Sequence, residues 1–552
     1  MPLAITALTS QDIENKGIRN LDDVAANTPG LTFSNLQGAF LPSPVIRGMA
    51  PINVNGENNV GIFIDGVFVS GREGLNFSQL DVERIEIIKG PQAALYGRNT
   101  FSGAINYVTA KPTDVFQGKT EITVGTDNRF LAAASASGPL IEGTLKGRIA
   151  ASIDTYDGAY DNSYSGIGQG ADIGGYEYRT GQASLLWTPN DIFEGELSLY
   201  VSRDQVDTPP QLPVAANCED RHDVDPSKSS RLQNFCGTFQ SIDRDSISVI
   251  PQAVGEDRKL NRAQLRLNWD TDIGTITSQS GYSALKHSGY IDGSRGEGEN
   301  VIFSYLGTQV AMAPPFNTYQ LGQLQTGLLQ IQPQTTVEEV SEELRFESPA
   351  DRDFRYSTGL YAFRTKMRGG DRGVIATKPL PADFTSFCLA CAFVGSGYTD
   401  FAPGGGDATF LPWFTNPPLG DTVPDKINHS EDKAYAVFAS AEWDFIENWT
   451  GRIEGRYTRT KKDFDNTATG ASGDDSWNTT DWRATLDYKP ADNITVYGSI
   501  AHAEKSGGFD ENRQFPERAD GGRNHPRCLR PGEEHHLRAR AEIRVSGQAA
   551  AF

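Results

Sequence analysis

The chain has 552 residues, a formal net charge of −21, 57 glycines, 10% aromatic residues and a mean hydropathy of −0.44. The negative charge argues against a nucleic-acid partner, since phosphate binding needs a basic surface. No stretch approaches the roughly 18 apolar residues that a membrane helix needs, which excludes a helical membrane protein. A transmembrane β-barrel is still possible, because its strands need apolar residues only at alternate positions.

Residues 1–112 have the signals of a small α+β domain. Asn20, with Asp23 three residues later, predicts the capped start of a short helix, which Thr28-Pro29-Gly30 ends. Asp65-Gly66 predicts a tight hairpin turn. Short strands are predicted at residues 3–8, 60–64, 67–69, 82–88 and 104–109.

From residue 113 to about 512 the pattern changes to strand-like segments of about ten residues with period-2 alternation. Tight turns recur at every second connection, and long polar loops are predicted near residues 156–176, 204–258, 290–337, 369–430 and 465–479. Short turns on one side and long loops on the other are typical of an outer-membrane barrel. About 13 strands are predicted, whereas plugged barrels have about 22. The predicted fold is therefore an incomplete all-β transmembrane barrel of antiparallel strands with a small N-terminal α+β domain.

Several motifs occur in order along the chain: LDDVAANTPGL from Leu21, VIRG from Val45, GIFIDGVFV from Gly61, LDVERIEIIKGPQAALYGRNTFSGAINYVTAKP from Leu80, RIEGRYTRTKKDF from Arg452, and VYGSIAHAEKSGGF from Val496. Together they resemble the TonB-dependent receptors for iron complexes, and the resemblance extends to about residue 510. It implies a plug domain at residues 1–112 and a partial barrel at residues 113–512. It also implies a location in the outer membrane of a Gram-negative bacterium.

The resemblance implies energy-coupled uptake of a scarce nutrient, with a ferric siderophore as the leading ligand. Cobalamin, haem and glycans are alternatives, as are an inactive truncated fragment and a passive porin or adhesin. Expected partners are the TonB complex, a ferric chelate and outer-membrane lipid. The TonB-contacting segment and a signal peptide are not visible in the sequence. No nucleophile–base pair, HExxH motif or phosphate loop is present, so we expect neither an enzyme nor a cofactor or resident metal.

The resemblance also suggests how the plug is held. In the family, plug arginines pair with barrel carboxylates, so Arg47 or Arg84 is expected to reach an inward barrel acid, with Glu343 and Glu454 the leading candidates, although plain surface charge is the alternative. The plug motif further includes Gly48, Asp65, Gly66, Glu86, Lys89, Gly90, Gly97 and Gly103. The glycines in it are expected to supply turns and close backbone approaches.

Four cysteines form two loop pairs, Cys218 with Cys236 and Cys388 with Cys391. They are either free thiols or one disulfide per loop, which an oxidising exterior would permit. A zinc half-site at Cys388 and Cys391 is a weaker hypothesis, because no second ligand pair follows at a suitable spacing. The isolated histidines His222, His287 and His429 do not favour a haem receptor.

Residues 513–552 depart from the preceding pattern, with eight arginines, no lysine and the unpaired Cys528. Codons can be chosen for Arg530 to Val545 that yield an alternating, strand-like segment when read one base later. We therefore interpret this tail as out-of-frame, non-native sequence, and we expect it to form no strand paired to the sheet.

Overall fold

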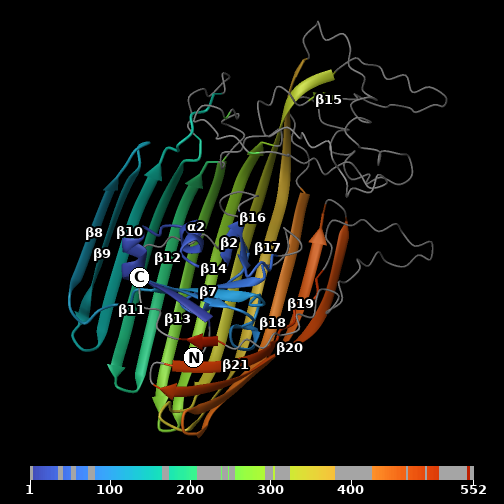
Figure 1. Cartoon of the computed structure of the whole chain (residues 1–552). Coiled ribbons are helices and arrows are strands. Elements are labelled where there is room, and N and C mark those ends of the chain that lie inside the picture. The colour runs from blue at the N-terminus through green and yellow to red at the C-terminus, as the bar shows by residue number, and fades with distance from the viewer. Residues whose placement is uncertain are drawn as a thin grey trace, which may run out of the picture.

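The computed structural model describes residues 4–34, 42–50, 58–71, 81–163, 173–207, 238, 247, 255–292, 302–304, 324–379, 426–467, 470–491, 494–508 and 544–546. Within this part the chain forms an N-terminal domain, residues 4–109, and one long antiparallel sheet, residues 117–546 (Figure 1). All five cysteines lie outside the described residues, so the disulfide hypothesis stays a prediction.

The N-terminal domain is built on a five-stranded sheet with the order β1-β6-β7-β4-β5. Its strands are β1 (Ala4–Thr9), β4 (Val60–Ile64), β5 (Val67–Val69), β6 (Val82–Lys89) and β7 (Gly103–Thr109). Three short helices, α1 (Ser10–Asn15), α2 (Leu21–Ala26) and α3 (Ala93–Tyr96), and a β2 (Leu31–Ser34) and β3 (Ser43–Ile46) hairpin complete the described part. The five predicted strands and the helix after Asn20 are confirmed, whereas α1, α3 and the β2–β3 hairpin were not predicted.

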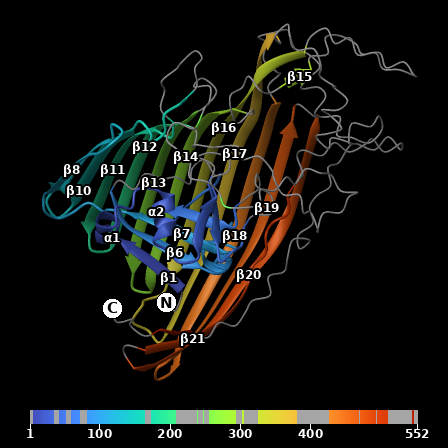
Figure 2. The ribbon, with the colours of Figure 1, turned by 45° about the horizontal axis from the view of Figure 1, so that its top comes forward.

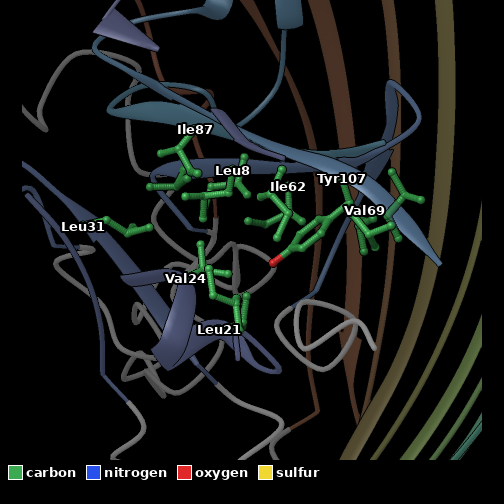
Figure 3. Packing of buried hydrophobic residues seen from close by; sticks show 14 of the residues in the cluster. Leu8, Leu21, Val24, Leu31, Ile62, Val69, Ile87 and Tyr107 are labelled. Carbon is green, nitrogen blue, oxygen red and sulfur yellow. The ribbon is translucent and has the colours of Figure 1, made fainter. Parts of the chain in front are cut away.

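The core of this domain lies between its sheet and helix α2 (Figure 3). Leu8, Ile62, Ile87 and Tyr107 from the sheet pack with Val24 of α2, and each is buried. The same cluster continues into the long sheet through the buried side chains Tyr200, Leu260, Leu285 and Val337. The N-terminal domain and the long sheet therefore share one hydrophobic core.

Thirteen strands of at least eight residues form the long sheet in the described part of the chain, which confirms the predicted number. They are β8 (Gln117–Val124), β9 (Phe130–Ile141), β10 (Leu145–Tyr156), β11 (Tyr176–Asn190), β12 (Phe193–Val206), β13 (Gly255–Thr271), β14 (Gly274–Asp292), β16 (Leu324–Glu347), β17 (Phe354–Pro379), β18 (Lys426–Ile446), β19 (Trp449–Asn466), β20 (Ala471–Ala491) and β21 (Ile494–His502). The short β15 (Ile302–Ser304) pairs with β16. The sheet curves around the N-terminal domain, which lies on its concave side (Figures 1 and 2).

Neighbouring strands pair in sequence order, and tight turns join every second pair, as between Thr271 and Gly274. The loop boundaries were predicted too wide, since residues 324–336, 370–379 and 471–479 belong to strands β16, β17 and β20. Backbone pairing with the neighbouring strands continues through these residues, beyond the points where the loops were predicted to begin. Among the described helices, none is both long and apolar enough to cross a membrane.

The tail contradicts one expectation. Strand β22 (Arg544–Ser546) pairs with β21 through Val545 opposite Val496, so the prediction that no residue after about 513 joins the sheet is wrong. Pairing satisfies backbone donors and acceptors that β21 would otherwise present at an open edge. The reading-frame hypothesis thus loses its structural argument and remains a prediction for the nucleotide sequence.

Candidate functional site

The Asp65-Gly66 turn between β4 and β5 is where the N-terminal domain meets β13 and β14. Both turn residues have positive φ, 50° and 81°, as the predicted tight hairpin requires. The Asp65 carbonyl oxygen accepts hydrogen bonds from Arg266 at 2.8 Å, Gln279 at 2.7 Å and Gln264 at 3.2 Å. Three donors from the sheet therefore converge on one backbone oxygen of the domain.

The Asp65 side chain, unlike its carbonyl oxygen, forms hydrogen bonds within its own domain. Its two oxygens accept from the Thr109 amide at 2.8 Å and the Thr109 hydroxyl at 2.9 Å, which ties the turn to the end of β7. Burial raises the pKa of the Asp65 carboxyl above its ordinary value, although the bonds from Thr109 oppose this shift. Asp65 is therefore the structural centre of this contact.

A second contact is an ion pair between Arg98, just after α3, and Asp432 on β18, with an N–O distance of 2.7 Å. Only 11% and 14% of the two side chains are exposed. The guanidinium of Arg98 also lies 5.0 Å from the ring centre of Phe363 on β17. A largely buried pair with an aromatic neighbour restrains the plug more than an exposed pair, which contributes little.

Two further contacts each involve an acid, one from the N-terminal domain and one from the long sheet. Asp81 of the N-terminal domain forms an ion pair with Arg148 of β10, and both are largely buried. Glu339 of β16 accepts from the Ser70 amide at 2.8 Å and from the Ser70 hydroxyl. The contacts described so far therefore involve strands from β10 to β18.

The predicted acid Glu454 does take part in the interface, but through an intermediary. It pairs with Arg483 of the neighbouring strand at 2.7 Å, and the same arginine donates to Gln92 of the N-terminal domain at 2.7 Å. All three residues are buried. Glu454 therefore orients a sheet arginine toward the domain.

The predicted pairing of Arg84 with Glu343 or Glu454 is wrong. Arg84 pairs with Glu83 at 2.7 Å and Glu86 at 2.8 Å in its own domain, because those acids are its nearest neighbours along β6. Glu343 pairs with Arg345 at 2.6 Å on its own strand. Glu343, like Glu454, is thus paired with an arginine of the sheet.

The remaining predicted residues lie inside the N-terminal domain. Arg47 follows β3 with φ 55°, and its guanidinium lies next to Gly90. Lys89 donates to the Pro29 carbonyl oxygen at 2.6 Å. Gly48, like Gly90, has a positive φ. These residues support the domain's own turns, and the structure does not bring Arg47 or Lys89 to Glu343 or Glu454.

Two of the predicted close backbone approaches occur. A Cβ on Gly103 would lie 2.3 Å from the Ile88 carbonyl oxygen of the paired strand. A Cβ on Gly97 would lie 2.8 Å from the guanidinium carbon of Arg456 on β19. Buried Arg456 also lies over the rings of Tyr361 and Phe438, at 5.1 and 5.4 Å. Gly97 therefore leaves room for a sheet arginine against the domain.

A small polar cavity lies beside this contact, between the loop after α3 and strands β19 and β20. Its lining includes Asn58, Arg98, Thr458, Asp481 and Lys505. Its enclosed volume of about 40 Å³ has room for a few water molecules. In this conformation the cavity is too small for an organic metal chelate.

Sequence reasoning missed most of the residues that make the interface. Arg98 and Gln92 lie in the quoted motif from Leu80, so that motif could have pointed to them. Arg148, Asp432 and Arg483 carry no local signal beyond a polar residue at an inward position. Only the packing of the domain against the sheet selects them.

Two family descriptions match the chain. Residues 1–104 match the TonB-dependent Receptor Plug Domain, and residues 220–526 match TonB dependent receptor-like, beta-barrel. Within the described part, the first match covers nearly all of the N-terminal domain, and the second covers strands β13 to β21.

Similar proteins include receptors for iron complexes. The pesticin receptor of Yersinia pestis is 26% identical over 186 residues, which cover 34% of this chain and 27% of that protein. The ferripyoverdine receptor of Pseudomonas aeruginosa is 31% identical over 152 residues, covering 27% of this chain and 18% of the receptor. The matched part thus spans less than a third of the length of these relatives.

The fold is similar to that of the ferric yersiniabactin uptake receptor of Yersinia pestis, with a TM-score of 0.67 at 16% sequence identity. This similarity covers 96% of the present chain and 68% of the receptor.

Proposed function

The chain belongs to the TonB-dependent receptor family, and we propose on this premise that it acts in the energy-coupled uptake of an iron complex across the outer membrane. Proteins of this family are outer-membrane receptors and transporters of Gram-negative bacteria, not enzymes. The N-terminal domain is the plug, and the long sheet is the barrel wall.

The observation that carries the proposal is the seating of the plug against the concave face of the sheet. Arg98 with Asp432, Asp81 with Arg148, and Gln92 with Arg483 connect the plug to three separate parts of the wall. A plug held at several points blocks passage until some contacts are broken. Uptake then needs work from outside the receptor, and the TonB complex is the proposed source.

The names of several relatives support an iron complex as the ligand. Two of them are named for pesticin and ferripyoverdine, and a solved structure of the same fold is that of a ferric yersiniabactin uptake receptor. We therefore assign a ferric siderophore to this chain as its proposed ligand.

The test is a binding measurement on the full 552-residue chain in detergent micelles. Ferric and iron-free forms of one siderophore are titrated while tryptophan fluorescence is followed, with cyanocobalamin, haemin and a maltodextrin as competing classes. We expect the ferric form to bind more tightly than the iron-free form. Binding of cobalamin, haem or glycan alone would contradict the ligand, and failure to bind any of these ligands would contradict the receptor function of this chain.

A further inference from the structure

Four basic residues form a row across neighbouring strands of the long sheet. Arg179 of β11 pairs directly with Arg203 of β12, Arg203 with Lys259 of β13, and Lys259 with Lys286 of β14. Strands lie about 4.8 Å apart, so the row is about 14 Å long. In a chain with a net charge of −21, four aligned cations need a physical reason.

All four side chains point away from the plug. Each is exposed, whereas Thr180, Ser202, Leu260 and Leu285, their neighbours along the strands, are buried on the plug side. Successive residues of a strand point to opposite faces, so the row lies on the convex, outer face.

Within the described residues, no carboxylate is within ion-pair distance of Arg203, Lys259 or Lys286. Arg203 donates to the Ser202 carbonyl at 2.6 Å and the Asn261 amide oxygen at 3.1 Å, neither of which neutralises it. Arg179 alone pairs with an acid, Glu177. Like charges directly opposite each other destabilise a sheet, and the Arg179–Glu177 pair offsets this repulsion at one end of the row only.

The position of the row along the strands indicates what offsets it. On β11 the row lies eight residues from the exposed Trp187 at the short-turn end, about 26 Å along the strand. With a strand tilt of about 40°, this is about 20 Å of height, close to the thickness of the apolar outer band. Outward residues between the two levels are mostly apolar and exposed, including Leu185, Leu197, Leu199, Val201 and Leu265. The cations therefore lie where the apolar band ends, on the side of the long connections.

We propose that Arg203, Lys259 and Lys286, with Arg179 at the end of the row, form a binding site for the phosphate groups of membrane lipids. A phosphate between two adjacent strands can accept charge-assisted hydrogen bonds from two of these side chains. The apolar side chains next to the row contact the acyl chains of the same lipid. The lipid charge offsets the repulsion within the row.

The proposal is tested on the full chain in detergent by native mass spectrometry. The lipids are phosphatidic acid, which carries a phosphate monoester, and phosphatidylcholine, which is zwitterionic. The wild-type chain is expected to retain phosphatidic acid in preference. Each basic residue at an anionic surface strengthens binding about fivefold, so the triple variant R203Q/K259Q/K286Q should bind it about a hundredfold more weakly.

The matched control is R364Q/K433Q/K461Q, which removes three cations from the outer face that already have acidic partners. Arg364 and Lys433 pair with Glu431 at 2.6 and 3.0 Å, and Lys461 pairs with Asp474 at 3.5 Å. This control, and the charge-conserving R203K/K259R/K286R, should retain the lipid. Equal binding by the triple glutamine variant would overturn the proposal. So would displacement of the lipid by an equal concentration of inorganic phosphate, which would assign the row to a free anion.

Discussion

At the scale of single residues, the plug is held by side chains of the wall that reach inward more than by its own arginines. Arg266, Arg148 and Arg483 all extend from the sheet to plug atoms. Among the plug arginines, Arg98 pairs with Asp432 at 2.7 Å and Arg19 with Glu121 of β8 at the longer distance of 3.5 Å. This arrangement suits a plug that must keep its own fold while its outer surface changes partners. It also makes backbone atoms and small residues of the plug important to seating.

Gly97 is the most sensitive such position. Gly97→Ala combines a backbone conformation largely restricted to glycine, with φ 81° and ψ −132°, which costs a side chain about 1–3 kcal/mol, with overpacking against Arg456, which costs about 1–3 kcal/mol. We expect faster hydrogen exchange in residues 93–103. Gly143→Ala is the control, because Gly143 has φ 70° but no atom within 4 Å of the added Cβ. Equal effects of the two substitutions would mean that the Arg456 contact is unimportant.

Asp65 should make plug stability depend on pH. Its pKa is raised above the ordinary value of 3.8 by burial, with Glu196 raising it further and Arg266 lowering it. The folded plug therefore holds this proton more tightly than the unfolded chain does. The protonated Asp65 carboxyl therefore adds to the free energy of unfolding of the plug. This contribution is complete below pH 3.8 and is lost as the pH rises through the raised pKa of Asp65.

The check compares wild type with Asp65→Asn, which cannot ionise but can still accept from the Thr109 amide and tolerates a positive φ. Hydrogen exchange of the β4–β5 hairpin is measured from pH 4 to pH 8, with rates corrected for intrinsic pH dependence. We expect protection to fall with pH in the wild type and to fall less in the variant. Identical profiles would remove Asp65 as the cause.

At the scale of elements, local signals set the short helices of the plug. Asn20 accepts from the Asp23 amide at 2.9 Å, and Asp23 accepts in return from the Asn20 amide at 3.3 Å, which is the predicted capping box. Thr9 and Asp12 form the same motif before α1. That second motif is a signal in the sequence that should have predicted α1.

Removal of the cap should loosen α2 and, through buried Leu21 and Val24, the plug core. We expect Asn20→Ala to destabilise the helix by about 1 kcal/mol, and Asn20→Ser to be nearly neutral, because serine is also a good N-cap. Amide exchange of residues 21–27 measures the effect. A serine variant as unstable as the alanine variant would show that another property of Asn20 matters.

At the scale of the whole molecule, seating is distributed over ion pairs of unequal burial. Arg98–Asp432 is largely buried, whereas Lys119–Glu14, which also connects wall and plug, is 56% exposed at both ends. Water screens the second pair and side-chain entropy opposes it. The two pairs therefore provide an internal comparison.

A double-mutant cycle on Arg98→Gln and Asp432→Asn should give a coupling free energy of about 1–3 kcal/mol. The same cycle on Lys119→Gln and Glu14→Gln should give less than about 1 kcal/mol. The quantity measured is the free energy of opening of the plug amides in the full chain, from hydrogen exchange. Equal coupling in both cycles would show that burial does not determine how well a pair holds the plug.

The sequence by itself determined the features that depend on local chemistry. Period-2 alternation predicted the long strands, turn residues predicted the tight hairpins, and Asp65-Gly66 and Asn20 with Asp23 predicted a turn and a cap that the structure contains. These outcomes follow from backbone geometry and from which face of a strand must be apolar, and both are properties of neighbouring residues.

Only the tertiary structure decided which charges meet across the interface. Arg84 has two acids as neighbours on its own strand, so its distant pairing failed, while Arg148 and Asp432 found plug partners that no spacing in the sequence indicates. The tail was misjudged for a related reason, since β22 is selected by the open edge of β21 rather than by its own composition. Ion pairs and edge pairing depend on what lies opposite in space, and the curvature of the sheet around the plug sets that arrangement.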